Sequence, residues 1–180
     1  MILSAYTLKN IDHPSVSKPA DSVFQLPEKL LQFGTGVLLR GLPDYFIEKA
    51  NRQGIFNGRI VVVKSTSQGG TSDFEKQDGL YTIHVRGIED GKKIEENLIN
   101  SSISRVLNAQ DEWRLVLECA HDHNMSIIVS NTTEVGIQLV KEDIRNSPPK
   151  SFPGKLLAFL YERFNAFSGS EQSGMVIIPT

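Results

Sequence analysis

Cysteine is nearly absent from this chain, and its scarcity excludes one class of architecture. The 180 residues include a single cysteine, Cys119. One thiol cannot close an internal disulfide, which is the pattern of a protein kept in a reducing compartment. A catalytic role for Cys119 would need a base and a lowered pKa, and no family-type signature surrounds it, so we expect a small buried hydrophobic side chain there.

Long apolar runs and a surplus of positive charge are missing as well. No apolar run approaches the ~20 residues of a membrane span. The first ten residues lack the basic segment followed by an apolar one that marks a secretory signal. The formal net charge is -2, so nothing favours nucleic acid as a partner. We therefore expect a cytoplasmic protein that binds neither membranes nor nucleic acid.

What the sequence does contain is an alternation of short apolar runs with segments of helical spacing. The runs that predict buried strands are 29–33, 59–64, 125–130 and 175–180. The segments that predict helices are 38–50, 111–121 and 156–164. The alternation predicts a Rossmann-type α/β fold, which is a doubly wound, mostly parallel sheet with helices on both faces.

Prolines, glycines and polar stretches subdivide the chain further. We expect an irregular lead-in segment over residues 1–28 and one α/β domain over residues 29–180. Pro43 lacks the amide that would bond the carbonyl of Leu39, so we expect a kink or break there, and Gly54 is expected to end the helix. A loop is expected over 65–79, and a pair of strands over 80–86 and 94–99.

The last apolar run, 175–180, has the composition of a strand in the middle of a sheet. Natural domains rarely stop inside such a strand, because termini are usually polar and exposed. We therefore expect the native polypeptide to continue beyond Thr180.

The strongest functional signal is Gly34-Thr35-Gly36, which lies between the first predicted strand and the first predicted helix. In a βαβ unit the first glycine permits a tight turn, and the second lets the backbone approach a pyrophosphate without a Cβ. Amides at the helix start would face the anion, and Arg40 would add a cation. Leu39 stands where the usual fingerprint has its third glycine. The alternative for Gly-x-Gly alone is an ordinary tight turn.

The end of the second predicted strand bears on which dinucleotide is bound. NAD sites usually place an Asp or Glu there to hold the adenosine ribose, whereas this chain has Lys64-Ser65-Thr66. A lysine beside the ribose would favour the 2′-phosphate of NADP. Alternatively, Lys64 is a solvated strand end, and both interpretations stay open here.

A second polar cluster, Ser130-Asn131-Thr132-Thr133-Glu134, follows another predicted buried strand. Ligands bind at the carboxyl ends of strands in open parallel sheets. Small hydroxyl and amide side chains there suit a ribose or a nicotinamide. Alternatively, Thr132 or Thr133 caps a helix that has Glu134 in its first turn, and the two roles are compatible.

Two further polar clusters predict no site. His121-Asp122-His123 has no third ligand nearby in the sequence, so surface histidines are expected rather than a metal. The acidic residues within 73–78 are expected to be solvated, except for Asp78, which remains a candidate site residue.

Several segments taken together resemble one family. They are Leu31 to Gly41, Gln77-Asp78-Gly79-Leu80-Tyr81-Thr82, Ser130 to Gly136, Ser151-Phe152-Pro153-Gly154-Lys155-Leu156 and Val176-Ile177-Ile178-Pro179-Thr180. Their joint pattern resembles the mannitol dehydrogenase family, the long-chain polyol-specific dehydrogenases. The match runs from about Leu30 to Thr180. In that family a bulky residue is common where Leu39 stands.

The resemblance implies a metal-free oxidoreductase that uses NAD to interconvert D-tagaturonate and D-altronate in hexuronate breakdown. It implies that the acid–base lysine lies in a C-terminal helical domain beyond Thr180, so no catalytic residue is expected within these 180 residues. The partners implied are the cofactor, a sugar-acid substrate and that C-terminal domain. The residues expected to contact the cofactor are Gln32, Phe33, Gly34, Thr35, Gly36, Val37, Leu38, Leu39, Arg40, Gly41, Lys64, Ser65, Asp78, Ser130, Asn131, Thr132, Thr133 and Glu134.

Two other functions stay open at this stage. A related enzyme acting on mannitol, fructuronate or a sugar phosphate would share this half, because substrate choice is expected to reside in the other half. A free-standing nucleotide-binding module without catalysis would also carry the same turn. NADP remains an alternative to NAD.

Overall fold

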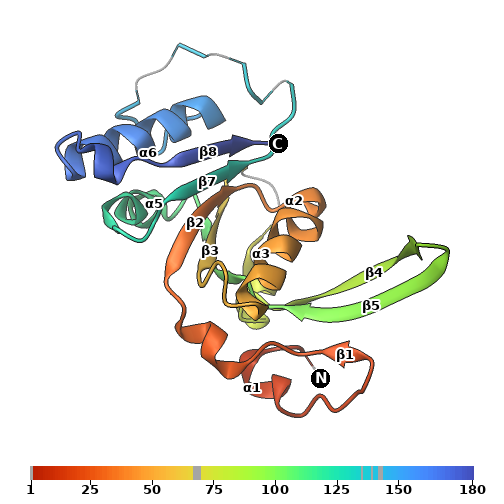
Figure 1. The fold of residues 1–180 in the computed structure, drawn as a ribbon. Coiled ribbons are helices and arrows are strands. Elements are labelled where there is room, and N and C mark those ends of the chain that lie inside the picture. The colour runs from red at the N-terminus through yellow and green to blue at the C-terminus, as the bar shows by residue number, and fades with distance from the viewer. Residues whose placement is uncertain (1, 67–69, 135, 139, 142–143) are drawn as a thin grey trace.

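Five parallel strands form the central sheet of the structure, which is a computed structural model (Figure 1). It describes residues 2–66, 70–134, 136–138, 140–141 and 144–180. In spatial order the strands are β6 (Ile103–Asn108), β3 (Arg59–Lys64), β2 (Glu28–Phe33), β7 (Ile127–Ser130) and β8 (Val176–Pro179). Every neighbouring pair in this sheet is parallel, as the alternation of strands and helices predicted.

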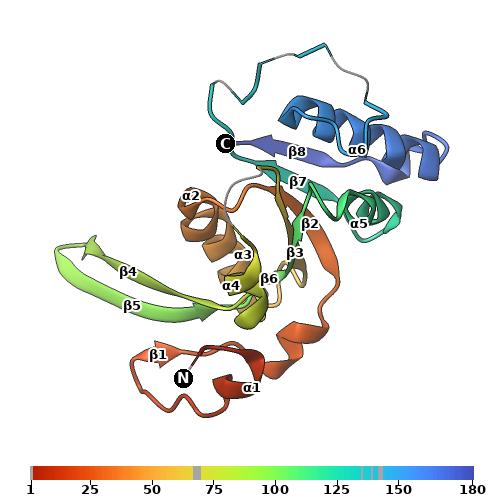
Figure 2. The ribbon, with the colours of Figure 1, turned by 180° about the vertical axis from the view of Figure 1, so that it is seen from behind.

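Helices cover both faces of this sheet (Figures 1 and 2). One face carries α2 (Val37–Gly41) and α3 (Pro43–Arg52), and the other carries α5 (Trp113–Glu118) and α6 (Phe152–Ala166). A short 3-10 helix, η2 (Cys119–His121), extends α5, and another, η3 (Glu171–Ser173), precedes β8. The predicted Rossmann-type doubly wound fold is therefore confirmed.

The β3 strand shows why the apolar runs were readable as buried strands. All six of its residues are buried. Val61 and Val63 join the core beneath α5 and α6, whereas Ile60 and Val62 join the core beneath α2 and α3. Because successive side chains point to opposite faces, a strand covered on both faces must be apolar throughout.

The helix predicted over 38–50 is broken, as the proline suggested. α2 ends at Gly41, Leu42 adopts a non-helical backbone (φ -122°, ψ -75°), and Pro43 opens α3. Gly54 has φ +67° just after the end of α3, which fits its predicted role as a stop.

The apolar residues of this helix pair do not form its buried face. The apolar residues Leu38, Leu42 and Phe46 are half-exposed or more, whereas the carboxylates Asp44 and Glu48 are buried. Helical spacing identifies a stripe of like residues, but polar partners elsewhere in the fold decide which stripe faces inward.

The lead-in segment is less irregular than expected. It contains α1 (Ala5–Leu8), β1 (Val16–Ser17) and a 3-10 helix, η1 (Asp21–Gln25). The β1 strand pairs with the long hairpin of β4 (Tyr81–Glu89) and β5 (Lys92–Asn100), which confirms the predicted strand pair. Together they form a second, three-stranded sheet, and the hairpin projects away from the central sheet (Figure 1).

Three elements differ from the sequence-based expectation. The β6 strand was not predicted, because Ser104 and Arg105 interrupt its apolar pattern. In the structure Arg105 forms an ion pair with Glu28 at 2.9 Å. The expected loop 65–79 contains the short helix α4 (Ser72–Lys76). Instead of lying centrally, β8 occupies a sheet edge, and all four of its residues are exposed.

The α6 helix buries two charged residues, Lys155 and Arg163, beside its apolar ones. Its N-terminus is capped by Ser151, whose Oγ accepts from the Gly154 amide at 3.0 Å. Phe159 is fully buried, but Leu157 and Phe164 are more than half exposed.

In the parts of the chain that the structure describes, no helix combines the length and apolar character needed to cross a membrane.

Candidate cofactor-binding site

The winding of the chain reverses between β2 and β7, and a cavity lies at this point. From β2 the chain proceeds to β3 and β6 on one side, and it then returns to form β7 and β8 on the other. In doubly wound sheets such a reversal separates the loops and opens a crevice at the carboxyl ends of the strands. The cavity there measures about 510 Å³.

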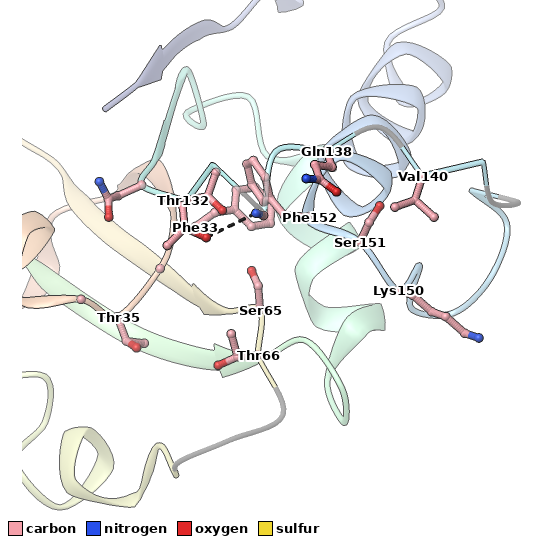
Figure 3. A pocket seen from close by; sticks show the side chains of 15 residues that line it. Phe33, Thr35, Ser65, Thr66, Thr132, Gln138, Val140, Lys150, Ser151 and Phe152 are labelled. Carbon is pink, nitrogen blue, oxygen red and sulfur yellow. Dashed lines mark hydrogen bonds between the residues drawn. The ribbon is translucent and has the colours of Figure 1, made fainter.

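The cavity is lined by the segments that follow β2, β3 and β7 and by the approach to α6 (Figure 3). Its lining residues are Phe33, Gly34, Thr35, Gly36, Ser65, Thr66, Asn131, Thr132, Thr133, Gly136, Gln138, Val140, Lys150, Ser151 and Phe152. Hydroxyl and amide groups are therefore frequent in the wall, and among these described residues Lys150 is the charged one.

The two glycines of the turn after β2 meet different constraints. Gly34 has φ +125°, and its amide donates to the Val63 carbonyl at 3.0 Å. A Cβ there would lie 3.2 Å from Leu39 Cδ1. Gly36 has φ -65°, and a Cβ there would meet no atom within 4 Å. The fold therefore requires glycine at 34 but not at 36, where the open space belongs to the cavity.

The segment after β3 contributes a buried hydroxyl. Ser65 Oγ is inaccessible to solvent and has no hydrogen-bond partner among the described residues. It lies in the cavity wall next to Thr66. A buried polar atom without a partner is costly, so this hydroxyl fits a site whose ligand brings a polar group.

Two aromatic rings meet in the same wall. The rings of Phe33 and Phe152 lie 5.5 Å apart, edge to face, and join the end of β2 to the start of α6. In Figure 3, Thr35, Ser65 and Thr66 lie on one side of this pair, and Gln138 and Ser151 lie on the other. The site thus combines an apolar back with polar flanks, which is the usual build of a small-molecule pocket.

The sequence left Lys64 either as a cation beside the ribose or as a solvated strand end, and the structure shows a third arrangement. Its side chain is buried rather than solvated, and its Nζ donates to the carbonyl of Thr66. It does not line the cavity. Lys64 therefore fixes the backbone after β3.

Arg40 and Asp78 do not line the cavity either. The Arg40 guanidinium lies 5.5 Å and 5.8 Å from the ring centres of Phe74 and Tyr81. The Asp78 carboxylate is exposed and accepts from the Ala5 amide at 2.9 Å. The expected phosphate cation and ribose ligand are thus not among the residues that the structure brings together.

The cluster after β7 divides between the two predicted roles. Asn131, Thr132 and Thr133 line the cavity, whereas Ser130 and Glu134 do not. Thr133 Oγ1 accepts from the Gly136 amide at 3.3 Å, so Thr133 caps a turn. The described residues 132–134 and 136–138 contain this turn and no helix. Val135 lies outside the described residues.

The other predicted residues surround the turn without lining the cavity; they are Gln32, Val37, Leu38, Leu39 and Gly41. Sequence reasoning assigned no contact to several residues that do line it, namely Thr66, Gly136, Gln138, Val140, Lys150, Ser151 and Phe152. The segment from Ser151 to Leu156 contributed to the family resemblance. That signal could have pointed to Ser151 and Phe152.

The residues set aside as structural behave differently from one another. Cys119 is buried, and burial raises the pKa of its thiol to about 11, so it is not a thiolate nucleophile at neutral pH. His121 pairs with Glu162 at 2.7 Å on the surface. Within the described residues, no three His, Cys, Asp or Glu side chains form a group that could hold a metal ion.

The fold matches that of two solved polyol dehydrogenases. One is the mannitol 2-dehydrogenase of Pseudomonas fluorescens in a ternary complex with NAD and D-mannitol, and the other is a D-sorbitol dehydrogenase in substrate-free form. Each match has a TM-score of 0.80 at 20% identity and covers 99% of this chain, with 38% and 39% of the other chain. The chain therefore has the Rossmann-type fold that occurs in these dehydrogenases.

The sequence is similar to altronate oxidoreductases. It is 44% identical over 157 residues to that of Halalkalibacterium halodurans, 41% over 160 residues to that of Bacillus subtilis, and 32% over 166 residues to that of Bacteroides thetaiotaomicron. These alignments cover 86%, 88% and 92% of this chain but 31%, 33% and 35% of the relatives. The chain thus spans about a third of the length of the curated relatives that it matches.

No protein-family model matches the chain. The resemblance inferred from the motifs is nevertheless confirmed by these alignments and by the shared fold: the chain is a relative of the altronate oxidoreductases.

Proposed function

We propose that residues 29–180 bind NAD in the cavity between β2 and β7, as the cofactor-binding part of an oxidoreductase that acts on CH–OH groups. The observation that carries the proposal is the cavity itself, which lies at the reversal of strand order. Its wall leaves open space at Gly36 and presents the Ser65 hydroxyl, which has no hydrogen-bond partner in the described part of the chain.

The lining residues suit the parts of a dinucleotide. The turn that follows Gly34 would bring backbone amides to the diphosphate, and no Cβ at Gly36 would block its approach. Ser65, Thr66 and Asn131 would hydrogen-bond the ribose and amide groups. The bound NAD supplies or accepts a hydride, and the chain's own contribution is to bind and orient it.

The substrate pair that we propose is D-tagaturonate and D-altronate, and the support is the name shared by the relatives. We place the acid–base residue outside these 180 residues, because the relatives are about three times as long. The proposed setting is the cytoplasm. NADP remains the alternative cofactor, since no carboxylate occurs among the described lining residues.

Direct titration of the chain with NAD+ and NADP+, followed calorimetrically, tests the cofactor assignment. We expect NAD+ to bind and Ser65→Ala to raise its Kd about 3- to 10-fold, because one hydrogen bond is lost. Ser15→Ala, an exposed serine of the lead-in segment, is the matched control and should leave Kd unchanged. If only NADP+ binds, NADP takes the place of NAD in the proposal. If neither dinucleotide binds, the proposal is refuted.

The oxidoreductase assignment is tested by NADH oxidation with D-tagaturonate. A polypeptide as long as the relatives should turn over, whereas the 180-residue chain should not. Fructuronate and keto-sugar phosphates in the same assay, and mannitol with NAD+ in the direction of NADH formation, separate the related substrate classes. Turnover by the 180-residue chain alone would contradict the placement of the acid–base residue.

A further inference from the structure

A buried polar cluster lies beneath the turn that forms the cavity wall. Its members come from five different elements and none of them lines the cavity. They are Gln32 on β2, Arg40 on α2, Asp44 on α3, Tyr81 on β4 and Asn100 on β5. Asp44, Gln32 and Asn100 are fully buried. A cluster of this kind has a large energetic effect on whatever it contacts.

The cluster holds the glycine turn and α2 at two points. Gln32 Nε2 donates to the carbonyl of Gly34 at 3.3 Å. The hydroxyl of Tyr81 donates to the carbonyl of Arg40 at 3.0 Å, in the last turn of α2. The backbone that would receive the dinucleotide is therefore fixed from below by Gln32 and Tyr81.

The number of protons available to this cluster constrains the state of Asp44. The Tyr81 oxygen lies 3.0 Å from the Arg40 carbonyl and 3.2 Å from Asp44 Oδ2. A phenol has one proton to donate, and a carbonyl can only accept. If the phenol proton goes to Arg40, the contact with Asp44 is a hydrogen bond only when the carboxyl itself carries a proton.

Unpaired atoms nearby support a neutral carboxyl. Asp44 Oδ1 and Gln32 Oε1 are buried acceptors without a donor among the described residues, and the buried donor Arg40 Nε has no acceptor among them, so it does not bond the Asp44 carboxyl. Burial raises the pKa of Asp44 to about 7, although Tyr81, Gln32 and Arg40 each lower it. Burial and Asp44 together raise the pKa of Tyr81, so the phenol keeps its proton.

We infer that Asp44 is a positioning residue, which as a neutral acid donates a hydrogen bond to the Tyr81 oxygen. The Tyr81 hydroxyl is then free to donate its own proton to the Arg40 carbonyl, and this bond holds α2 in place. This inference rests on the proposed function, because the backbone so positioned is the wall of the dinucleotide cavity. Loss of the proton turns Asp44 into the stronger acceptor, and Tyr81 then donates to it instead of to Arg40. Dinucleotide affinity therefore falls as the pH rises through about 7.

The charged and titratable groups around this carboxyl and its partner Tyr81 come, among the described residues, from three elements. They are Arg40 of α2, Tyr81 of β4 and, one turn along α3, Glu48. Glu48 is occupied elsewhere, since it accepts from Arg52 Nε at 2.8 Å and from the Ser101 amide at 2.8 Å. Glu48→Gln therefore provides a matched control, which removes a second buried carboxylate of the same helix without touching the Arg40 carbonyl.

The test is the Kd for NADH, followed by its fluorescence, between about pH 6 and pH 8.5 in four proteins. For the unmodified chain we expect Kd to rise about 5- to 10-fold over this range, as one hydrogen bond is lost. Asp44→Asn keeps a donor toward Tyr81, so its Kd should match the low-pH value throughout. Tyr81→Phe should bind weakly at every pH, and Glu48→Gln should keep the slope of the unmodified chain.

Two results would overturn the inference while the proposed function stands. One is a measurable Kd that does not change with pH in the unmodified chain. The other is an Asp44→Asn protein that retains the slope, which would assign the titration to another group. If the unmodified chain binds no NADH at any pH, the proposed function itself fails and the inference fails with it.

Discussion

Gly34 and Gly36 stand two residues apart, yet the structure requires glycine at one and leaves the other unconstrained. Gly34 has φ +125° and lies under the Leu39 side chain. Gly36 has φ -65° and open space where a Cβ would be. A glycine that the fold does not need, in the wall of a cavity, suits the close approach of a diphosphate that we propose there.

The two glycines therefore give a paired prediction. Gly34→Ala should lower the free energy of unfolding by about 1–3 kcal/mol, because alanine is strained at that φ and contacts Leu39. Gly36→Ala should change it by less than about 0.5 kcal/mol, while NAD+ affinity falls about 10-fold or more through contact of the new methyl group with the ligand.

Urea denaturation and calorimetric titration of both variants measure the two quantities. Equal loss of stability in the two variants would show that Gly36 is a structural glycine. If Gly36→Ala leaves the affinity for NAD+ unchanged, the diphosphate does not bind at this turn.

At the scale of elements, α6 is tied to the rest of the fold by one buried arginine. Arg163 donates to the carbonyls of Ser173, Ala120 and Met125 at 3.1, 3.0 and 3.0 Å. Asp122 provides a fourth carbonyl. These carbonyls lie before β7 and before β8, so Arg163 connects the helix to the loops that lead into two strands of the central sheet.

Arg163→Met should therefore destabilise the chain by about 3 kcal/mol or more, because buried carbonyls lose a charged donor. Arg163→Lys should recover little of this, since one ammonium cannot reach the positions that a planar guanidinium reaches. The matched control is Arg114→Met on α5, whose exposed side chain pairs with Glu118 at 3.5 Å.

That control should cost less than about 1 kcal/mol. Unfolding midpoints in urea compare the three variants. Similar values for Arg163→Met and Arg114→Met would mean that water replaces the arginine at these carbonyls.

At the scale of the whole molecule, stability should depend on pH through Asp44. Its pKa rises from an ordinary value of 3.8 to about 7 in the folded chain, mainly because of burial. The folded state therefore holds this proton more tightly than the unfolded state does. The stabilisation from this group is complete below about pH 4, decreases as the pH rises to about 7, and is absent above that.

The free energy of unfolding should thus fall by an amount on the order of 4 kcal/mol between about pH 4 and pH 7.5, relative to Asp44→Asn, since each pKa unit corresponds to about 1.4 kcal/mol. Urea denaturation of both proteins at several pH values measures the difference. A difference that stays constant with pH would show that Asp44 is ionised in the folded chain even under mildly acidic conditions.

Local pattern alone determined the central elements of this protein. The apolar run of β3 predicted a strand buried on both faces, Pro43 predicted the break between α2 and α3, and Gly34 predicted the turn before α2. These features follow from side-chain periodicity and from backbone geometry. Both act over a few neighbouring residues and are therefore readable in sequence.

Only the tertiary structure decided where polar side chains point and which segments share a wall. Asp44 is buried because Tyr81, 37 positions away, reaches its carboxyl. Lys64 bonds a carbonyl instead of facing solvent, and Phe152 joins Phe33 across more than a hundred residues. β6 went unrecognised because its edge position allows charged residues such as Arg105. Contacts between distant segments leave no local periodicity, so the polar partners in the site emerge only when the chain is folded.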